Sequence, residues 1–260
     1  MNRDIKYKLT IGILFSVIIV QMGFILSFYL KKIRPLRGIS GRIAIVLDDW
    51  GYNLNNLEIL KDIEYPITLA ILPHLEYSEK IANFAKVIGK EIILHLPLEP
   101  KTKKDYIGWE RFTITTDMPE KKIKEILSEA IDSLFGIKGV SNHMGSRATE
   151  DERTMTIIFK ELKKRKLYFL DNLTSPNSVS RRIAERLSLK FIRRDIFLDN
   201  LRHLSYIKNQ FKKLKIRALK KSWAVGIGHC DRITLEVLKE QMPMAEKEGF
   251  RFVFLSELIK

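Results

Sequence analysis

The feature that most constrains the fold is an alternation that runs from about residue 42 to the end of the chain. Short apolar or β-branched runs recur, and amphipathic helical stretches separate most of them. The runs are IAIVLDD, ITLAILPH, EIILHLPLE, GVSNHMG, LYFLDN, KFIRRDIFLD, WAVGIGHC and FRFVFL. Strands that alternate with helices in this way form a parallel sheet, which either closes as a barrel or stays open with helices on both faces. The pattern therefore predicts an α/β domain.

The helical stretches carry start signals. Asp117 with Glu120, and Thr149 with Glu152, match the capping-box spacing, in which a side chain and a backbone amide three residues apart exchange hydrogen bonds. After the first of these pairs, apolar residues recur at helical spacing up to Leu134. We therefore predict that helices begin close to both pairs.

The N-terminal part of the chain has a different character. Leu9 to Leu30 is a run of 22 residues without a formal charge, long enough as a helix to cross a bilayer core of about 30 Å. No small-residue cleavage site follows the run, which favours an uncleaved anchor over a signal peptide. We predict a basic N-terminus over residues 1–8, a transmembrane anchor over 9–30, a linker over 31–41 and a folded domain over 42–260. Basic residues flank both ends of the run, so charge alone does not assign the side of the membrane.

Acidic and histidine side chains gather at the ends of the apolar runs. They are Asp48, Asp49, His74, His95, His143, Asp171, Asp195 and His229. In a parallel barrel the carboxyl ends of the strands converge on one mouth, where active sites are built. Four of the five histidines fall at this mouth. Imidazole and carboxylate groups bind Zn²⁺ and similar ions, and such an ion activates water, so the pattern predicts metal-assisted hydrolysis.

The sequence lacks the motifs that are typical of other classes of site. The single cysteine, Cys230, excludes an internal disulfide and a cysteine-based metal cluster. The G-x-S-x-G nucleophile elbow, the P-loop and a complete dinucleotide fingerprint do not occur. Adjacent Asp48 and Asp49 cannot flank a glycosidic bond on opposite faces, which disfavours a glycosidase.

Six segments, in the same order, resemble the divergent polysaccharide deacetylase family. They are IVLDDWGYN, LHLPLEP, GVSNHMGSRAT, FLDNLTS, DIFLDN and GIGHC. The resemblance covers about residues 43–258 and implies a distorted (β/α)7–8 barrel. In characterised deacetylases, an Asp-Asp pair after the first strand supplies a general base and then a metal ligand, which is similar to Asp48 and Asp49. A late histidine, proposed there as the general acid, resembles His229.

The metal-binding motif of the family is only partly matched. NHMGSR has His143 at the position of the first histidine of that motif, but Arg147 at the position of the second. His95, at the end of a neighbouring strand, is the natural replacement. The resemblance thus implies a divalent ion, Zn²⁺ in the first place and Ni²⁺, Co²⁺ or Mn²⁺ as alternatives, held by Asp49, His95 and His143.

The resemblance also implies a substrate and a location. The expected activity is removal of acetyl groups from an envelope polysaccharide or another acylated glycan, by a domain on the outer side of the cytoplasmic membrane. Residues expected in the second shell or against the substrate are His74, Glu99, Asn142, Arg147, Asp171 and Asp195. Two alternatives stay open, a degenerate barrel that binds glycan without hydrolysing it and an envelope interaction protein.

A basic stretch near the C-terminus, Arg202 to Lys221, contains no acidic residue. Its loose apolar stripe is typical of a helix with a solvated basic face, and the same charge would attract anionic lipid or polyanionic glycan. The formal net charge of +15 favours a polyanionic partner. Nucleic acid is not expected, because base-reading motifs are absent and a membrane-tethered domain rarely meets it.

Overall fold

The computed structural model describes residues 19–22, 40–102 and 112–259. The chain divides into two compact units, Met1–Gly38 and Ile39–Lys260. Most of the predicted anchor lies outside the described residues. Its described part, residues 19–22, is helical. Within the described part of the chain, no helix is both long and apolar enough to cross a membrane.

Among the described residues of the second unit, nine strands form one sheet in which every pairing is parallel. The strands are β1 (Gly41–Trp50), β2 (Thr68–Ile71), β3 (Glu91–Leu98), β4 (Gly139–Met144), β5 (Tyr168–Asp171), β6 (Phe191–Arg193), β7 (Ile196–Phe197), β8 (Trp223–His229) and β9 (Phe250–Phe252). Their order is β6-β5-β4-β3-β2-β1-β8-β7, and β9 pairs with the first residues of β1. The predicted parallel α/β fold is confirmed.

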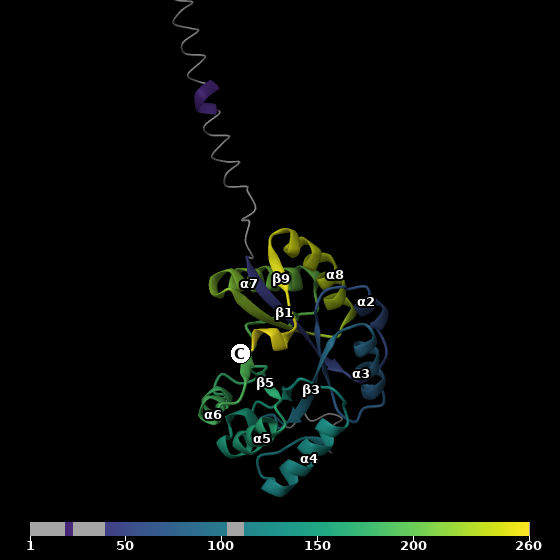
Figure 1. The fold of residues 1–260 in the computed structure, drawn as a ribbon, viewed down its shortest axis with the longest axis vertical. Coiled ribbons are helices and arrows are strands. Elements are labelled where there is room, and N and C mark those ends of the chain that lie inside the picture. The colour runs from purple at the N-terminus through teal and green to yellow at the C-terminus, as the bar shows by residue number, and fades with distance from the viewer. Residues whose placement is uncertain (1–18, 23–39, 103–111, 260) are drawn as a thin grey trace, which may run out of the picture. The chain divides into compact units, whose positions relative to one another are not determined.

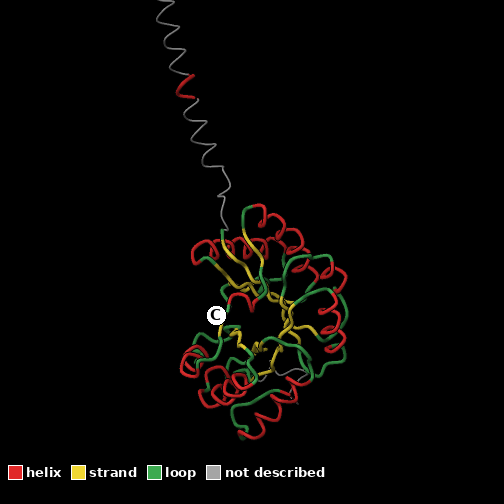
Figure 2. The backbone as a smooth tube through the Cα atoms, in the orientation of Figure 1, coloured by secondary structure: helices red, strands yellow, loops and turns green. Residues whose placement is uncertain are grey.

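The sheet curls around a centre, with helices on its outside (Figure 2). β6 and β7 stand at the two ends of the strand order, although only Arg194 and Asp195 separate them along the chain. The run KFIRRDIFLD, expected as one strand, therefore forms two strands on opposite edges of the sheet. Between these edges the described strands do not pair, so the fold is a curled parallel sheet with an open seam.

The helices follow the strands along the chain (Figure 1). They are α2 (Leu57–Lys61), α3 (Ser78–Val87), α4 (Glu120–Asp132), α5 (Glu152–Lys164), α6 (Ser180–Leu187), α7 (Leu204–Lys221) and α8 (Arg232–Lys247), with short 3-10 turns at Ala148–Glu150 and Leu255–Leu258. Both predicted capping boxes are wrong. Pro119 occupies the N-cap of α4 without a side-chain hydrogen bond. Asp151 caps α5, accepting a hydrogen bond from the backbone amide of Thr154 at 2.7 Å.

Side chains of β1 alternate between two hydrophobic layers, as the period of two in a strand requires. Ile43, Ile45 and Leu47 belong to the larger core, which includes the buried side chains of the outer helices. Ala44 and Val46 belong to a smaller core that also holds inward side chains of other strands. The smaller core fills the inside of the curl and is called the inner core below, and the larger one is called the outer core. In a regular strand, a side chain near the strand end reaches the mouth only if it lies on the same face as the inner-core side chains before it. This alternation is called the inward phase below.

Candidate active site

Histidines at the ends of β3 and β8 continue the inward phase. On β3, Ile93 belongs to the inner core and His95 follows two residues later. On β8, Val225 and Ile227 belong to the inner core and His229 follows them. Because alternate residues of a strand share a face, these imidazoles point into the mouth of the curl.

Two adjacent carboxylates of β1 reach the same mouth through a bulge. In a regular strand, Asp48 and Asp49 would point to opposite faces. Here Leu47 pairs with Leu69 and Trp50 with Ile71, so β1 contains one more residue than β2 over this interval. Asp49 has a φ of 66°, in the left-handed region that aspartate tolerates better than most residues. Both carboxylates therefore line the same cavity.

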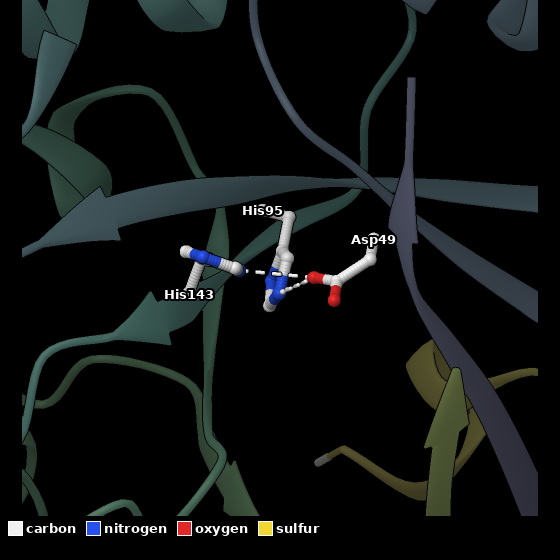
Figure 3. Close-up of side chains that lie close together, drawn as sticks. All are labelled: Asp49, His95 and His143. Carbon is white, nitrogen blue, oxygen red and sulfur yellow. Dashed lines mark hydrogen bonds and ion pairs between the residues drawn. The ribbon is translucent and has the colours of Figure 1, made fainter. Parts of the chain in front are cut away.

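Three of the predicted residues meet at one carboxylate oxygen (Figure 3). Asp49 Oδ1 lies 2.9 Å from His143 Nδ1 and 3.3 Å from His95 Nε2. The ring centroids of the two histidines are 4.9 Å apart, with nearly perpendicular planes. Asp49, His95 and His143 each offer a donor atom within 4.8 Å of the others. The structure thus brings together the three side chains that the sequence suggested as metal ligands, which are called the donor cluster below.

The donor set fits a tetrahedral Zn²⁺ or a similar ion. Ligand atoms at 2.0–2.1 Å from zinc with tetrahedral angles lie about 3.3 Å from one another. The two distances to Asp49 Oδ1, 2.9 and 3.3 Å, are close to this spacing. Two imidazoles and one carboxylate also leave a fourth position for water or substrate.

The electrostatics of the cluster suit metal binding. Burial lowers the pKa of His95 to about 4, so its ring is neutral and keeps a lone pair for a metal. Its other nitrogen, Nδ1, lies 2.8 Å from the Ser141 hydroxyl, which orients the ring. Burial alone would raise the pKa of Asp49, but hydrogen bonds with His143 and His95 outweigh it and lower the pKa well below the ordinary value.

Asp48 has a different environment from its neighbour. It is 3% exposed, and burial together with the adjacent charge of Asp49 raises its pKa well above the ordinary value. Its Oδ2 accepts a hydrogen bond from Asn172 Nδ2 at 2.7 Å and lies 3.7 Å from His95 Nε2. Its Oδ1 is buried, with no hydrogen-bond partner among the described residues. Asp48 therefore carries a strongly basic carboxylate oxygen next to the donor cluster.

His229 is held by a buried carboxylate. His229 Nδ1 lies 3.0 Å from Asp199 Oδ1, and the backbone amide of His229 donates to Asp199 Oδ2 at 2.7 Å. Burial by itself lowers the pKa of His229, but the hydrogen bond and charge of Asp199, with the charges of Asp49 and Asp48, raise it to about 9. His229 Nε2 lies 3.6 Å from Asp49 Oδ2, on the side of the donor cluster. At neutral pH this side chain is protonated and can donate a proton.

A cavity of about 290 Å³ joins these groups. It is lined by Asp48, Asp49, His95, Asn142, His143, Met144, Asn172, Thr174, Arg194, Phe197, Asn200 and His229. Asn142 is fully buried and bridges two strands, because its Nδ2 donates to the Met144 carbonyl and its Oδ1 accepts from the backbone amide of Asn172. It shapes the wall of the cavity.

Three predicted residues on loops lie outside this lining. Exposed His74 has a φ of 59°, and its ring stacks on Phe112 at 4.3 Å. Arg147, expected near the metal ligands or the substrate, instead forms an ion pair with Glu99, with 3.4 Å between Nη1 and Oε1. Glu99 Oε2 also accepts two hydrogen bonds from a neighbouring threonine. Position 147, where the metal-binding motif described above has its second histidine, thus contributes to loop structure.

Two predicted carboxylates lie outside the lining, Asp171 because of its strand phase and Asp195 because it lies near the amino end of β8. On β5, Phe169 belongs to the outer core, and Asp171 follows it with the same phase. Asp171 accepts hydrogen bonds from Ser178 and from a backbone amide of its own loop. Asp195 accepts from the backbone amide of Val225, at the start of β8 and far from its carboxyl end.

Sequence reasoning gave no role to three residues that surround the cluster of carboxylates and histidines. Asn172, not Asp171, continues the inward phase of Tyr168 and Leu170, and this alternation could have identified it. Asp199 lies two residues after β7, the strand next to β8, and its contact with His229 depends on strand order. Arg194 lines the cavity and stacks over the Phe197 ring at 4.4 Å, and no sequence signal indicates this position.

Comparisons with known proteins agree with this architecture. Residues 45–259 match the family model described as divergent polysaccharide deacetylase. The uncharacterised protein YibQ of Escherichia coli is 30% identical over 204 residues, which are 78% of this chain and 63% of YibQ. An uncharacterised Haemophilus influenzae protein is 31% identical over 200 residues, 77% of this chain and 70% of that protein. The chain thus spans less than two thirds of the length of YibQ.

A solved structure shares the fold. The crystal structure of an uncharacterised Agrobacterium tumefaciens protein superposes with a TM-score of 0.79 at 23% identity, covering 84% of this chain and 89% of that one. The family match spans nearly the whole of the curled-sheet unit, and the six sequence motifs lie within or next to it. The chain belongs to the divergent polysaccharide deacetylase family.

Proposed function

We propose that the domain is a metal-dependent hydrolase that removes acetyl groups from an acylated glycan. The observation that carries this proposal is the convergence of Asp49, His95 and His143 on one point, with Asp48 and His229 beside it. This arrangement supplies a place for a Lewis acid, a base and an acid within one cavity. Family membership supports glycan-linked acetyl groups as the substrate class.

Three side chains would hold the metal. Asp49, His95 and His143 provide one oxygen and two nitrogen donors, which suit Zn²⁺ and also Ni²⁺, Co²⁺ or Mn²⁺. When bound, a divalent ion supplies polarisation of the acyl carbonyl and activation of water. The hydroxyl of Ser141 fixes the ring of His95 for this role.

Asp48 and His229 divide the proton transfers. Asp48 takes a proton from the attacking water, because burial makes its carboxylate a stronger base than an exposed aspartate. His229, which Asp199 keeps protonated, donates a proton to the departing amine or alcohol of the glycan. A base and an acid are thus both placed next to the donor cluster.

The role of Asp199 predicts a shift in pH dependence. Activity requires the protonated imidazole, so it should fall as the pH rises past the pKa of His229, raised to about 9. Asp199→Asn removes the negative charge at Nδ1, the pKa of His229 falls toward its ordinary value, and the descending limb of kcat/KM moves to lower pH. Thr234→Val, which removes an uncharged donor to Asp199, is the matched control and should leave the limb nearly in place. An unchanged limb in Asp199→Asn would show that His229 is not the acid.

The proposal includes a location. Residues 9–30 anchor the chain in the cytoplasmic membrane as an uncleaved single span, with the domain on the extracytoplasmic side, where envelope polysaccharides are found. The charge-free run and the absence of a cleavage site support this. N-terminal sequencing of the mature protein should start before residue 9, and protease added to intact spheroplasts should digest the domain. A mature chain that starts near residue 31, or a protected domain, would contradict the anchor or its orientation.

The activity itself is tested on the full chain in detergent. After dialysis against Zn²⁺, Ni²⁺ or Mn²⁺, the protein should retain one metal per chain by elemental analysis, and should release acetate from acetylated oligosaccharides. Chelation should abolish the release, and added metal should restore it. Protein that retains no metal would overturn the proposal. Glycan affinity that survives chelation, without acetate release, would identify a degenerate binding protein instead.

A further inference from the structure

α7 presents an unusual outer face. The helix contains seven lysine or arginine residues and no acidic one. Its buried side contacts the core through Ile207, Phe211, Leu214 and Ala218. On the opposite side, Ile216 is 44% exposed and Leu219 is 53% exposed. Large apolar side chains on a basic outer face favour contact with a membrane interface.

Lysines surround the two exposed apolar side chains. Lys212, Lys213 and Lys220 lie three or four residues from Ile216, so they share its outer face. All three lysines are exposed, and none has an ion-pair partner among the described residues. Other cations of the same helix do have partners; Lys215, for instance, pairs with Glu248. The outer face therefore carries uncompensated positive charge around an apolar centre.

A cationic cleft adjoins α7 at the seam of the sheet. It has a volume of about 500 Å³ and lies between the α6–β6 and α7–β8 segments. At its wall, Asp195, whose side chain is 5% exposed, accepts from Lys221 at 2.6 Å and from Arg217 at 3.3 Å. This buried carboxylate fixes two cations in place. Lys221 also lies 3.6 Å from the centre of the Trp223 ring.

Further cations line the cleft without partners of their own. Arg181, Lys190 and Arg193 line it, and no carboxylate of the described residues lies within ion-pair distance of them. Asp195 is already shared by two cations, and Glu185 is the other acid in the lining. Five cations against two carboxylates leave a net positive cleft, which favours an anionic ligand such as a phosphate ester.

The C-terminal part of α7 and the cleft lie at the end of the sheet where the described chain enters it. The backbone amide of Arg42, at the start of β1, donates to the carbonyl of Ser222, the residue that follows α7. A side chain at Gly41 would lie within 2.7 Å of the carbonyl of Ala218 in α7. The active site lies at the opposite ends of β1 and β8. The described part of the domain therefore begins, at Ser40, beside α7, which Figure 1 shows next to β1.

We propose that this end of the domain docks on the surface of an anionic phospholipid bilayer. Ile216 and Leu219 enter the interface, the surrounding lysines attract the negative surface, and the seam cleft takes a lipid phosphate. The proposal rests on the membrane anchor of the proposed function, which holds the domain at such a surface. An exposed apolar pair favours a bilayer over a soluble polyanion, which offers no apolar layer. Docking in this way turns the active-site mouth away from the lipid.

The test uses the full chain in nanodiscs of phosphatidylcholine, with and without phosphatidylglycerol. Cys230, the single cysteine, is replaced by serine, and Ile216→Cys carries a fluorophore. Doxyl-labelled lipid in the disc should quench this fluorophore several-fold more strongly when phosphatidylglycerol is present. The combined variant Lys212→Glu, Lys213→Glu and Lys220→Glu should reduce the quenching to the level seen in phosphatidylcholine discs.

A matched charge reversal at the mouth end is the control. Lys80, Lys121 and Arg232 lie in the first turns of α3, α4 and α8 and are all exposed. Changing these three to glutamate alters the net charge equally and should leave the quenching unchanged. Inorganic phosphate competes for the seam cleft, so it should weaken docking more than sodium chloride of equal ionic strength. An equal effect of the two salts would show that the cleft takes no lipid phosphate.

The remaining outcomes separate the docking from its premise. A chain that enters both kinds of disc but shows equal, weak quenching would refute docking and leave the anchor intact. A chain that enters neither disc would refute the anchor and, with it, the docking. Neither readout depends on bound metal or acetate release, so loss of the proposed enzymatic function would be seen separately.

Discussion

Replacement of His143 by alanine is expected to remove the bound metal and the deacetylase activity together, while the fold remains. His143 Nδ1 and His95 Nε2 flank the same oxygen of Asp49, so loss of one imidazole leaves two donors where structural and catalytic zinc sites use at least three. The cluster lies at the strand ends, outside both hydrophobic cores. Elemental analysis and acetate release measure the two losses, and thermal unfolding in excess chelator checks the fold.

Two comparisons make this result interpretable. His203→Ala, at an exposed histidine before α7, is the matched control and should keep both metal and activity. His95→Ala should lose metal as His143→Ala does. If His95→Ala retains metal, the replacement of the family's second histidine by His95 is wrong. If His143→Ala retains metal, the whole ligand assignment is wrong.

Asp48→Asn is expected to separate turnover from metal binding. Asp48 is not among the three converging donors, and an asparagine side chain can still accept the hydrogen bond from Asn172. Metal content should therefore stay stoichiometric. Loss of a general base lowers turnover by about 10²–10⁴-fold. Elemental analysis and steady-state kinetics on the same preparation give both values.

The neighbouring substitution provides the contrast. Asp49→Asn replaces an anionic ligand by a neutral amide, so it should weaken metal binding severely, and added metal should recover part of the activity. Added metal should not rescue Asp48→Asn. Two variants with the same metal content and the same rate would show that the bulge at β1 does not give the adjacent carboxylates different functions.

The place of the histidines at strand ends explains why much of the site could be predicted from sequence. His95 and His229 stand at the ends of apolar runs, and the carboxyl ends of parallel strands converge on one mouth. The parallel fold follows from the alternation of the same runs with helices. The six segments that resemble the family, taken in order, added His143 and the Asp48–Asp49 pair to the predicted site.

The remaining features depend on local or long-range geometry. The bulge that turns Asp49 inward is a left-handed backbone conformation of one residue, and the sequence around it reads as a regular strand. Charge and a place at a strand end predict Asp171 as a site residue, although its phase points it outward. The partner of Arg147 could not be predicted, because Glu99 follows a different strand. The capping boxes failed because Pro119 and Asp151 hold the N-cap positions instead.

The open seam has a consequence for self-association. A sheet that does not close ends in two edges, whose unpaired amides and carbonyls could recruit a strand from another molecule. Here the edge strands are β6 and β7, of three and two residues. They present little backbone to an incoming strand, and the charged pair Arg194-Asp195 connects them. Short, charged edges thus protect the domain from edge-to-edge aggregation, although its sheet is not closed.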